Sequence, residues 1–277
     1  MAEVTRASLQ RITEEQGKQY KRLLAFVIFL GISLVMITVT FLNPSFMKGQ
    51  MRQSNNQAIV VKEVDLHFNQ LATLVGANSE ANANLLTSRE ALPIADYIVD
   101  YTLGVHLFRT NSTELAHHIY GAIKQNIDDD SASDAQDIRD GLKKQSDLVL
   151  ANVTTAFNLS LAVLGANLVN VLLIINVVIV VITMIMLVSL IQDLRGRLGW
   201  RQLIHEVTGG VMWAGFWMIL LFGFLAILPI FVTTQTLNLT GIGYLLELAS
   251  CTFLDYVIVG VVLYIIAAIP WQATSPK

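Results

Sequence analysis

The sequence predicts an all-α integral membrane protein with four transmembrane helices and an extracytoplasmic up-and-down helical bundle between the first and second spans. Of its 277 residues, 54% are hydrophobic and only 14% are charged, a composition typical of membrane proteins. Four apolar runs are each long enough to cross a hydrocarbon core. The long polar region between the first two runs has apolar residues at helical spacing, so it predicts helices rather than strands.

The first span is predicted at residues 23–42, a run of 20 uncharged residues that follows a basic segment at residues 1–22. A cleaved signal peptide has a shorter apolar region and a small-x-small cleavage site. No such site precedes Asn43-Pro44. The run is therefore interpreted as an uncleaved signal anchor.

The polar region at residues 43–166 is predicted to form the bundle. A first helix is expected from near Pro44 to about Leu86, because apolar residues recur there at spacings of three and four. A second helix is expected from Ser88, and a third behind a capping box that begins at Asn111. Helices of this length with short connections favour an up-and-down arrangement.

A long helix is predicted from about Ser133 to Arg195, so that the second span is continuous with a bundle helix. No charged residue occurs between Asp147 and Asp193. As a helix this uncharged stretch would be about 65–70 Å long, whereas a hydrocarbon core is only about 30 Å thick. Protein must therefore shield its outer half. Gly165 is the one position at which a bend is expected.

Two further spans complete the predicted division of the chain. In chain order, the predicted segments are a cytoplasmic N-terminal segment (1–22), the first span (23–42), the extracytoplasmic bundle (43–166), the second span (167–192), a basic cytoplasmic turn (193–210), the third span (211–232), a short outer loop (233–241), the fourth span (242–269) and a cytoplasmic tail (270–277).

The distribution of Lys and Arg predicts the orientation. The N-terminal segment has five basic residues, the turn after the second span has three, and the loop between the third and fourth spans has none. Basic residues in short loops mark the cytoplasmic side. Both termini are therefore expected in the cytoplasm and residues 43–156 outside, in a multi-pass protein of the plasma membrane.

Polar residues within the predicted spans are the candidates for function: Asp255, Glu247, Asn167, Asn170 and Asn176. An ionisable group at mid-bilayer is costly unless it is paired or hydrated. Asp255 and Glu247 are eight residues apart and share a broad helix face. They could line a polar path for protons or cations, or they could hold helices together through hydrogen bonds, as the asparagines could.

Other candidates are weaker, and neither a metal site nor a cofactor is predicted. Cys251 is the only cysteine, and the run Asp128–Asp130 lacks the alternating spacing and central glycine of a calcium loop. The bundle histidines lack a metal-binding spacing: His67, His106, His117 and His118. Catalytic and phosphate-binding motifs and nucleic-acid signatures are missing from the sequence, so an enzyme and a nucleic-acid partner are not expected.

The order of elements over about residues 23–195 resembles the ligand-binding bundles of bacterial chemoreceptors and sensor kinases. The resemblance is architectural and transfers no functional residue. Two more spans follow the second one here, in place of a signalling helix pair or a kinase.

The function expected from these observations is non-enzymatic. The bundle would bind a ligand or a protein partner, and the spans would contact lipid and a membrane protein partner or a second copy, as in a sensor, receptor or accessory subunit. The alternative is a transporter or channel subunit with a polar path lined by Asp255, Glu247 and Asn176.

Overall fold

The computed structural model describes residues 2–77, 84–145, 147–231 and 243–275. These residues form ten helices and no strands, which confirms the all-α prediction. The helices are α1 (Ala2–Val39), α2 (Pro44–Met51), α3 (Ser54–Val75), α4 (Ser88–Thr102), α5 (Thr113–Asn126), α6 (Ser133–Lys144), α7 (Val149–Ala156), α8 (Leu159–Arg197), α9 (Trp200–Phe231) and α10 (Gly243–Ala273). The predicted loop at 233–241 lies outside the described residues.

Four helices are long and apolar enough to cross a membrane, as expected for a multi-pass membrane protein. Their candidate spans are Gln19–Val39, Leu159–Arg197, Trp200–Leu228 and Ala249–Ala273. The chain divides into two compact units. The span unit comprises Met1–Ile37, Asn176–Thr233 and Ala249–Lys277, and the bundle unit comprises Thr38–Ile175 and Thr234–Leu248.

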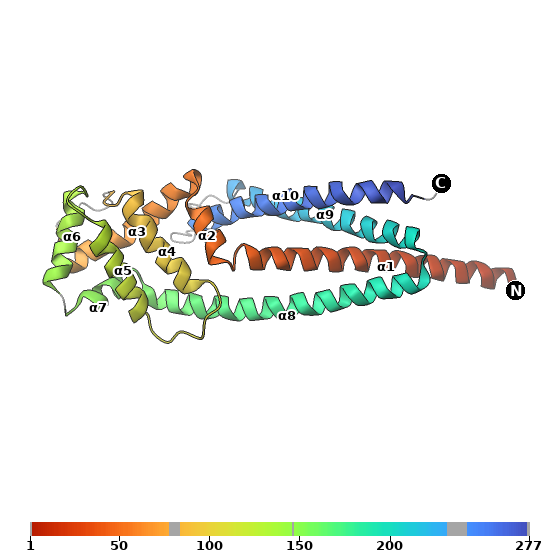
Figure 1. The fold of residues 1–277 in the computed structure, drawn as a ribbon, viewed down its shortest axis with the longest axis horizontal. Coiled ribbons are helices and arrows are strands. Elements are labelled where there is room, and N and C mark those ends of the chain that lie inside the picture. Colours follow the sequence, from red (N-terminus) through yellow and green to blue (C-terminus); the bar gives the residue numbers. More distant parts are fainter. Residues whose placement is uncertain (1, 78–83, 146, 232–242, 276–277) are drawn as a thin grey trace. The chain divides into compact units, whose positions relative to one another are not determined.

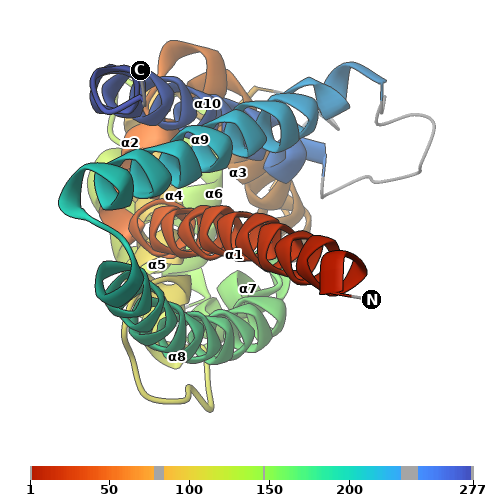
Figure 2. The ribbon, with the colours of Figure 1, turned by 90° about the vertical axis from the view of Figure 1, so that its right-hand side faces the viewer.

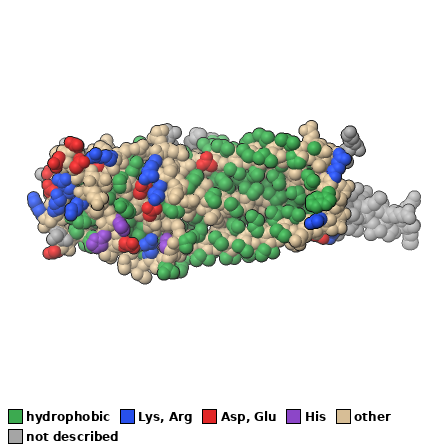
Figure 3. Space-filling view, in the orientation of Figure 1, with side chains coloured by type: hydrophobic (Ala, Val, Ile, Leu, Met, Phe, Trp, Pro, Cys, Tyr) green, Lys and Arg blue, Asp and Glu red, His purple; other side chains and the backbone are tan. Residues whose placement is uncertain are grey.

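In the span unit, α1 lies between α8 and α9, and α10 packs on the other side of α9 (Figures 1 and 2). Helices α8 and α10 are therefore the edges of a row. Hydrophobic side chains cover the visible face of this unit, and Lys and Arg gather at the end that holds the α8–α9 turn (Figure 3). At that end, Lys21 pairs with Glu206 at 2.8 Å.

Small and polar residues set the helix contacts of the span unit. A methyl group on Gly215 of α9 would lie 2.7 Å from the carbonyl oxygen of Gly260 in α10, so the two backbones nearly touch there. Between α8 and α1, the Asn176 side chain donates a hydrogen bond to the Leu34 carbonyl at 3.1 Å. Without a hydrophobic driving force between helices in lipid, close packing and such bonds hold spans together.

The described residues of the bundle unit share one apolar core, built from α3 to α7 and the start of α8, with Met51 added from the end of α2. Its fully buried side chains come from each of α3 to α8 and include Phe68, Leu71, Ile94, Leu115, Ile119, Ile138, Val153 and Leu159.

Asp65 of α3 is a buried carboxylate that orders the chain ahead of α4. It accepts hydrogen bonds from the backbone N–H groups of Leu85 and Leu86, each at 3.0 Å. Burial raises the pKa of Asp65 above its ordinary value, and the two backbone donors oppose that rise. Asp65 is therefore easier to protonate in the folded bundle than in the unfolded chain, so its contribution to stability is largest at low pH and falls as the pH rises through the raised pKa.

The first bundle helix is shorter than predicted. In place of one helix from Pro44 to Leu86, the chain forms α2 and α3. Gln53 has an extended backbone between them, and Gly76 ends α3 with a φ of +72°. A left-handed residue satisfies the last carbonyls of a helix but cannot continue it, and glycine adopts it without strain. The helical spacing of apolar residues continues across the break between α2 and α3 because both helices face the same core. The spacing alone therefore did not reveal the break.

The predicted start of α4 is confirmed, and that of α5 is shifted. Glu90 reaches back to the N–H of Thr87 at 2.6 Å and forms a capping box. The N-cap of α5 is Ser112 rather than Asn111. Glu114 pairs with Arg109 at 3.5 Å instead of closing the expected box.

The single long helix predicted from Ser133 to Arg195 is wrong, because the chain forms α6, α7 and α8 there. Asn158 interrupts the last two with a φ of +47°. Phe157 and Leu159 are both buried, although residues two apart in a helix point about 200° away from each other. The turn at Asn158, a residue type that tolerates this conformation, lets both enter the core. Helix α8 then runs through Gly165 without interruption.

Replacing Gly215 with alanine should destabilise the packing of α9 on α10. Its new methyl group would meet the Gly260 backbone, which no side-chain rotation can relieve, so the expected loss is about 1–3 kcal/mol. Gly223→Ala is the matched control, because its methyl group would meet only Val257, at 3.8 Å. Thermal unfolding of the full protein in mild detergent measures both. Equal melting temperatures for the two variants would contradict the close contact.

Candidate functional site

The asparagines predicted within the second span have structural roles in different places. Asn176 binds the backbone of α1. Asn167 makes a two-bond pair with Arg109: the Arg109 N–H donates to Asn167 Oδ1 and Asn167 Nδ2 donates to the Arg109 carbonyl, both at 2.8 Å. Asn170, which lies between these two residues in the sequence, is also buried. The Asn167 and Asn176 amides therefore hold backbone segments.

Asp255 is half-buried on α10 and is followed by Tyr256, which is fully buried. The Tyr256 ring packs on Phe222 of α9, with ring centroids 4.5 Å apart. Helix α10 is thus fixed against α9, while Asn176 faces α1 from the far edge of the row. Glu247 falls within α10, but its side chain lies outside the described part of the structure.

The bundle histidines lie apart from one another. His67 contacts the Ala156 carbonyl at 3.0 Å and stacks on Phe157, so it supports the chain just before the turn at Asn158. His118 stacks on Tyr97 with centroids 4.9 Å apart. In the part of the chain that the structure describes, no group of three or more His, Cys, Asp and Glu residues could hold a metal ion.

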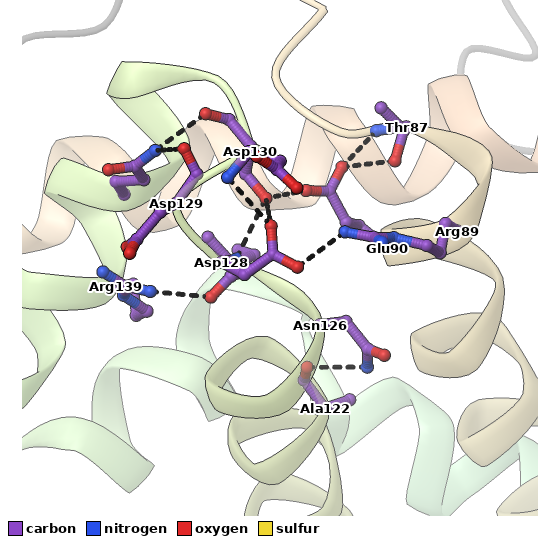
Figure 4. A network of polar contacts seen from close by, with 12 residues as sticks. Thr87, Arg89, Glu90, Ala122, Asn126, Asp128, Asp129, Asp130 and Arg139 are labelled. Carbon is purple, nitrogen blue, oxygen red and sulfur yellow. Dashed lines mark hydrogen bonds and ion pairs between the residues drawn. The ribbon is translucent and has the colours of Figure 1, made fainter.

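The acidic linker at Asp128–Asp130 belongs to a polar network that joins α4 to the α5–α6 connection (Figure 4). Glu90, which is buried, accepts a short hydrogen bond from the Ser131 hydroxyl in addition to its bonds from Thr87. Arg89 donates to Asp128 at 2.8 Å on the exposed side of the same network. The network joins the two segments by capping and pairing, and the carboxylates of Glu90 and Asp128 accept from donors of the chain itself.

One exposed surface of the bundle unit, on α8, is apolar. Three leucines on one face of α8 are exposed, Leu161 and Leu164 by 60% and 66%, and Leu168 similarly. We name Leu161, Leu164 and Leu168 the leucine stripe. They are spaced by three and four residues, so they lie in line along the helix. Isolated exposed leucines are ordinary, but contiguous ones mark an interaction surface.

The spacing of the three leucines is visible in the sequence, but the sequence does not show whether they are buried or exposed. Leu161 and Leu164 fall in an apolar run that was expected to face the bundle core, and Leu168 falls in the predicted second span. Only the packed structure shows that the core takes Leu159 and Ala166 from this helix and leaves the leucine stripe outside.

Comparison with known proteins does not identify a relative. No protein-family model matches the chain, and neither a curated protein nor a solved structure matches it at a significant level.

The Glu90 network gives a direct test of which contacts support the bundle. Glu90→Ala removes a buried acceptor from Thr87 and Ser131, and the expected loss of stability is about 2 kcal/mol or more. Arg89→Ala removes only an exposed ion pair with Asp128, which contributes at most about 1 kcal/mol. Amide hydrogen exchange of α4 and α5 in mild detergent reports the opening free energy in each variant. A larger effect for Arg89→Ala would show that the exposed pair, not the capping box, closes the bundle.

Proposed function

We propose that this protein is a non-enzymatic subunit or receptor of the plasma membrane, in which the bundle lies outside the cytoplasm and the leucine stripe binds a protein partner. The observation that carries the proposal is the exposure of Leu161 and Leu164 at a level of α8 that lipid does not reach. The proposed orientation is supported by the distribution of basic residues between the two ends of the spans.

The level of each leucine follows from counting along α8. With Asp193 at the inner boundary of the hydrocarbon core, the core of about 30 Å ends roughly 20 residues earlier, near residue 173. Leu164 and Leu161 then lie about 14 and 18 Å beyond that boundary. The headgroup layer adds only about 5–8 Å on each side. Lipid therefore cannot cover these two side chains, whereas another protein can.

The stripe suits an apolar helix of a membrane partner. Its residues form a ridge along α8, and ridges of this spacing pack into the grooves of a neighbouring helix. Burying a leucine side chain stabilises an interface by roughly 1.5–3 kcal/mol. A partner helix that emerges from the same membrane would meet the ridge without reorienting.

Helix α8 gives such a partner a mechanical connection to the spans. It is a single helix of 39 residues, with Leu159 and Ala166 in the bundle core and Asn176 bonded to α1. Packed helices shift between discrete arrangements by small translations or rotations. A partner that moves the first turns of α8 would therefore act on the contact with α1.

A double variant, Leu161→Glu with Leu164→Glu, should release the partner. A charge in an apolar interface must be desolvated without a partner group, so we expect at least about a tenfold loss of affinity, which corresponds to roughly 1.4 kcal/mol. Ser160→Glu is the matched control, because Ser160 is also exposed at the start of α8. The measurement is quantitative co-purification in mild detergent, with each captured protein identified by mass.

The outcomes of that experiment separate three cases. Loss of one captured protein from the double variant, but not from Ser160→Glu, supports the proposal; if that protein is a second copy of this chain, the partner is a homo-oligomer. Identical capture in all variants contradicts the proposal. If Asp255→Asn then abolishes an ion flux while capture is unchanged, the alternative of a transporter or channel subunit with a polar path replaces it.

The proposed orientation has its own test. In a Cys251→Ser background, Asp129→Cys should react with a membrane-impermeant maleimide in intact cells, because Asp129 is exposed on the bundle unit. Gln202→Cys, at an exposed position just after the basic α8–α9 turn, should react only after permeabilisation. The reverse pattern would place the bundle in the cytoplasm and overturn the orientation derived from the basic residues.

A further inference from the structure

The turn between α8 and α9 places an exposed tryptophan among arginines at one end of the span unit. Trp200, the first residue of α9, is 65% exposed. Arg195 and Arg197 lie in the last turn of α8, and Arg201 directly follows Trp200. We name Arg195, Trp200 and Arg201 the arginine–tryptophan cluster. Figure 3 shows Lys and Arg gathered at this end, next to a surface that is mainly hydrophobic.

Two other cations at this end are already paired with carboxylates. Arg197 donates to Asp193 Oδ1 at 3.1 Å, and the Tyr20 hydroxyl donates to Asp193 Oδ2 at 2.6 Å. Lys21 of α1 pairs with Glu206 of α9 at 2.8 Å. Helices α8 and α9 carry no other acidic residue. Both of their carboxylates are therefore engaged by groups outside the cluster.

The two arginines of the cluster keep their charge available for a ligand. The Arg195 guanidinium lies over the Trp200 ring, 5.1 Å from the ring centroid. Arg201 donates a long hydrogen bond to the Ser275 carbonyl at 3.5 Å. Both arginines are exposed, and among the side chains that the structure describes no carboxylate lies within ion-pair distance of either one. The cluster thus presents two uncompensated positive charges next to an aromatic ring.

The ends of the spans themselves give the level of the cluster in the membrane. With Asp193 at the inner boundary of the hydrocarbon core, Arg195 follows two residues later, or about 3 Å beyond that boundary. The two-residue turn and the contact between Arg195 and Trp200 keep the start of α9 next to the end of α8. The headgroup layer is about 5–8 Å deep, so the cluster lies within it. All of these residues belong to the span unit.

A phosphate with net negative charge is the ligand that suits this chemistry. Guanidinium groups bind phosphate oxygens through charge-assisted N–H donors in a planar fork. Tryptophan favours the headgroup level, where its ring contacts apolar groups and its N–H contacts polar ones. Basic groups at the ends of spans attract anionic headgroups. A zwitterionic headgroup carries a cation of its own, which the arginines repel.

We propose that the arginine–tryptophan cluster binds the headgroup of an anionic phospholipid in the leaflet at the α8–α9 turn. The lipid phosphate accepts hydrogen bonds from Arg195 and Arg201, and the Trp200 ring packs on the glycerol and the first acyl carbons. The bound lipid thereby joins the end of α8 to the start of α9. The proposal rests on the membrane level of α8 in the proposed function, and it is independent of the partner and of the side of the membrane that the turn faces.

Lipid retention measured by native mass spectrometry tests this site. The full protein in a nonionic detergent is mixed with equimolar phosphatidylglycerol and phosphatidylcholine that have the same acyl chains. The measured quantity is the ratio of the two complexes that carry a single lipid. The variant is Arg195→Gln with Arg201→Gln. Lys124→Gln with Lys144→Gln is the matched control, because it removes the same charge from two exposed positions of the bundle unit.

The wild-type protein should retain mainly phosphatidylglycerol. A basic residue near anionic lipid contributes about fivefold in affinity, so the double arginine variant should lower the ratio by about thirtyfold, while the control leaves it unchanged. Equal losses in the variant and the control would show that diffuse charge attracts the lipid, and would overturn the proposal. A wild-type ratio near unity would overturn it as well.

Two further arms identify the ligand and the role of the ring. Trp200→Ala keeps both charges and should lower phosphatidylglycerol retention by about threefold or more; unchanged retention would contradict the packing of lipid on the ring. Glycerol 3-phosphate supplies the same anion without acyl chains, so a large excess of it should leave the bound lipid in place. Displacement would show a site for soluble phosphates and overturn the lipid as occupant.

The lipid measurement is separate from the test of the leucine stripe. Leu161→Glu with Leu164→Glu should keep the wild-type lipid ratio, because neither residue belongs to the arginine–tryptophan cluster. Loss of partner capture with an unchanged lipid ratio concerns the proposed function alone. A lipid ratio near unity with partner capture intact overturns the lipid site alone.

Discussion

The length of α8 is the constraint on which this structure depends. Its 39 residues extend for about 58 Å, roughly twice the thickness of a hydrocarbon core. An apolar helix of that length is stable only if protein covers the part that lipid does not. The bundle unit supplies part of that cover, since its core takes Leu159 and Ala166 from the first turns of α8. The bundle leaves the leucine stripe uncovered. This exposed apolar surface is the basis of the proposed function.

Several polar side chains in the described part of this protein bond the backbone of a distant segment. Asn176 donates to the Leu34 carbonyl, and Asn167 bonds both backbone groups of Arg109. Asp65 accepts from the backbone N–H groups of Leu85 and Leu86. A buried polar group is costly unless it is hydrogen-bonded, and each of these is. The surface proposed for binding a partner, the leucine stripe, is apolar.

The sequence alone determined the helical class, the four apolar helices and the start of α4, because period, run length and capping chemistry are local properties. It predicted one long helix where Asn158 makes a turn, because both sides of the turn are apolar and periodicity does not show which face the core takes. It predicted Asn167 as a polar candidate of the second span but could not indicate its partner, Arg109, which is 58 residues away along the chain. Which leucines are covered, and which loop is fastened beside them, depends on contacts between distant segments. Only the tertiary structure decides those.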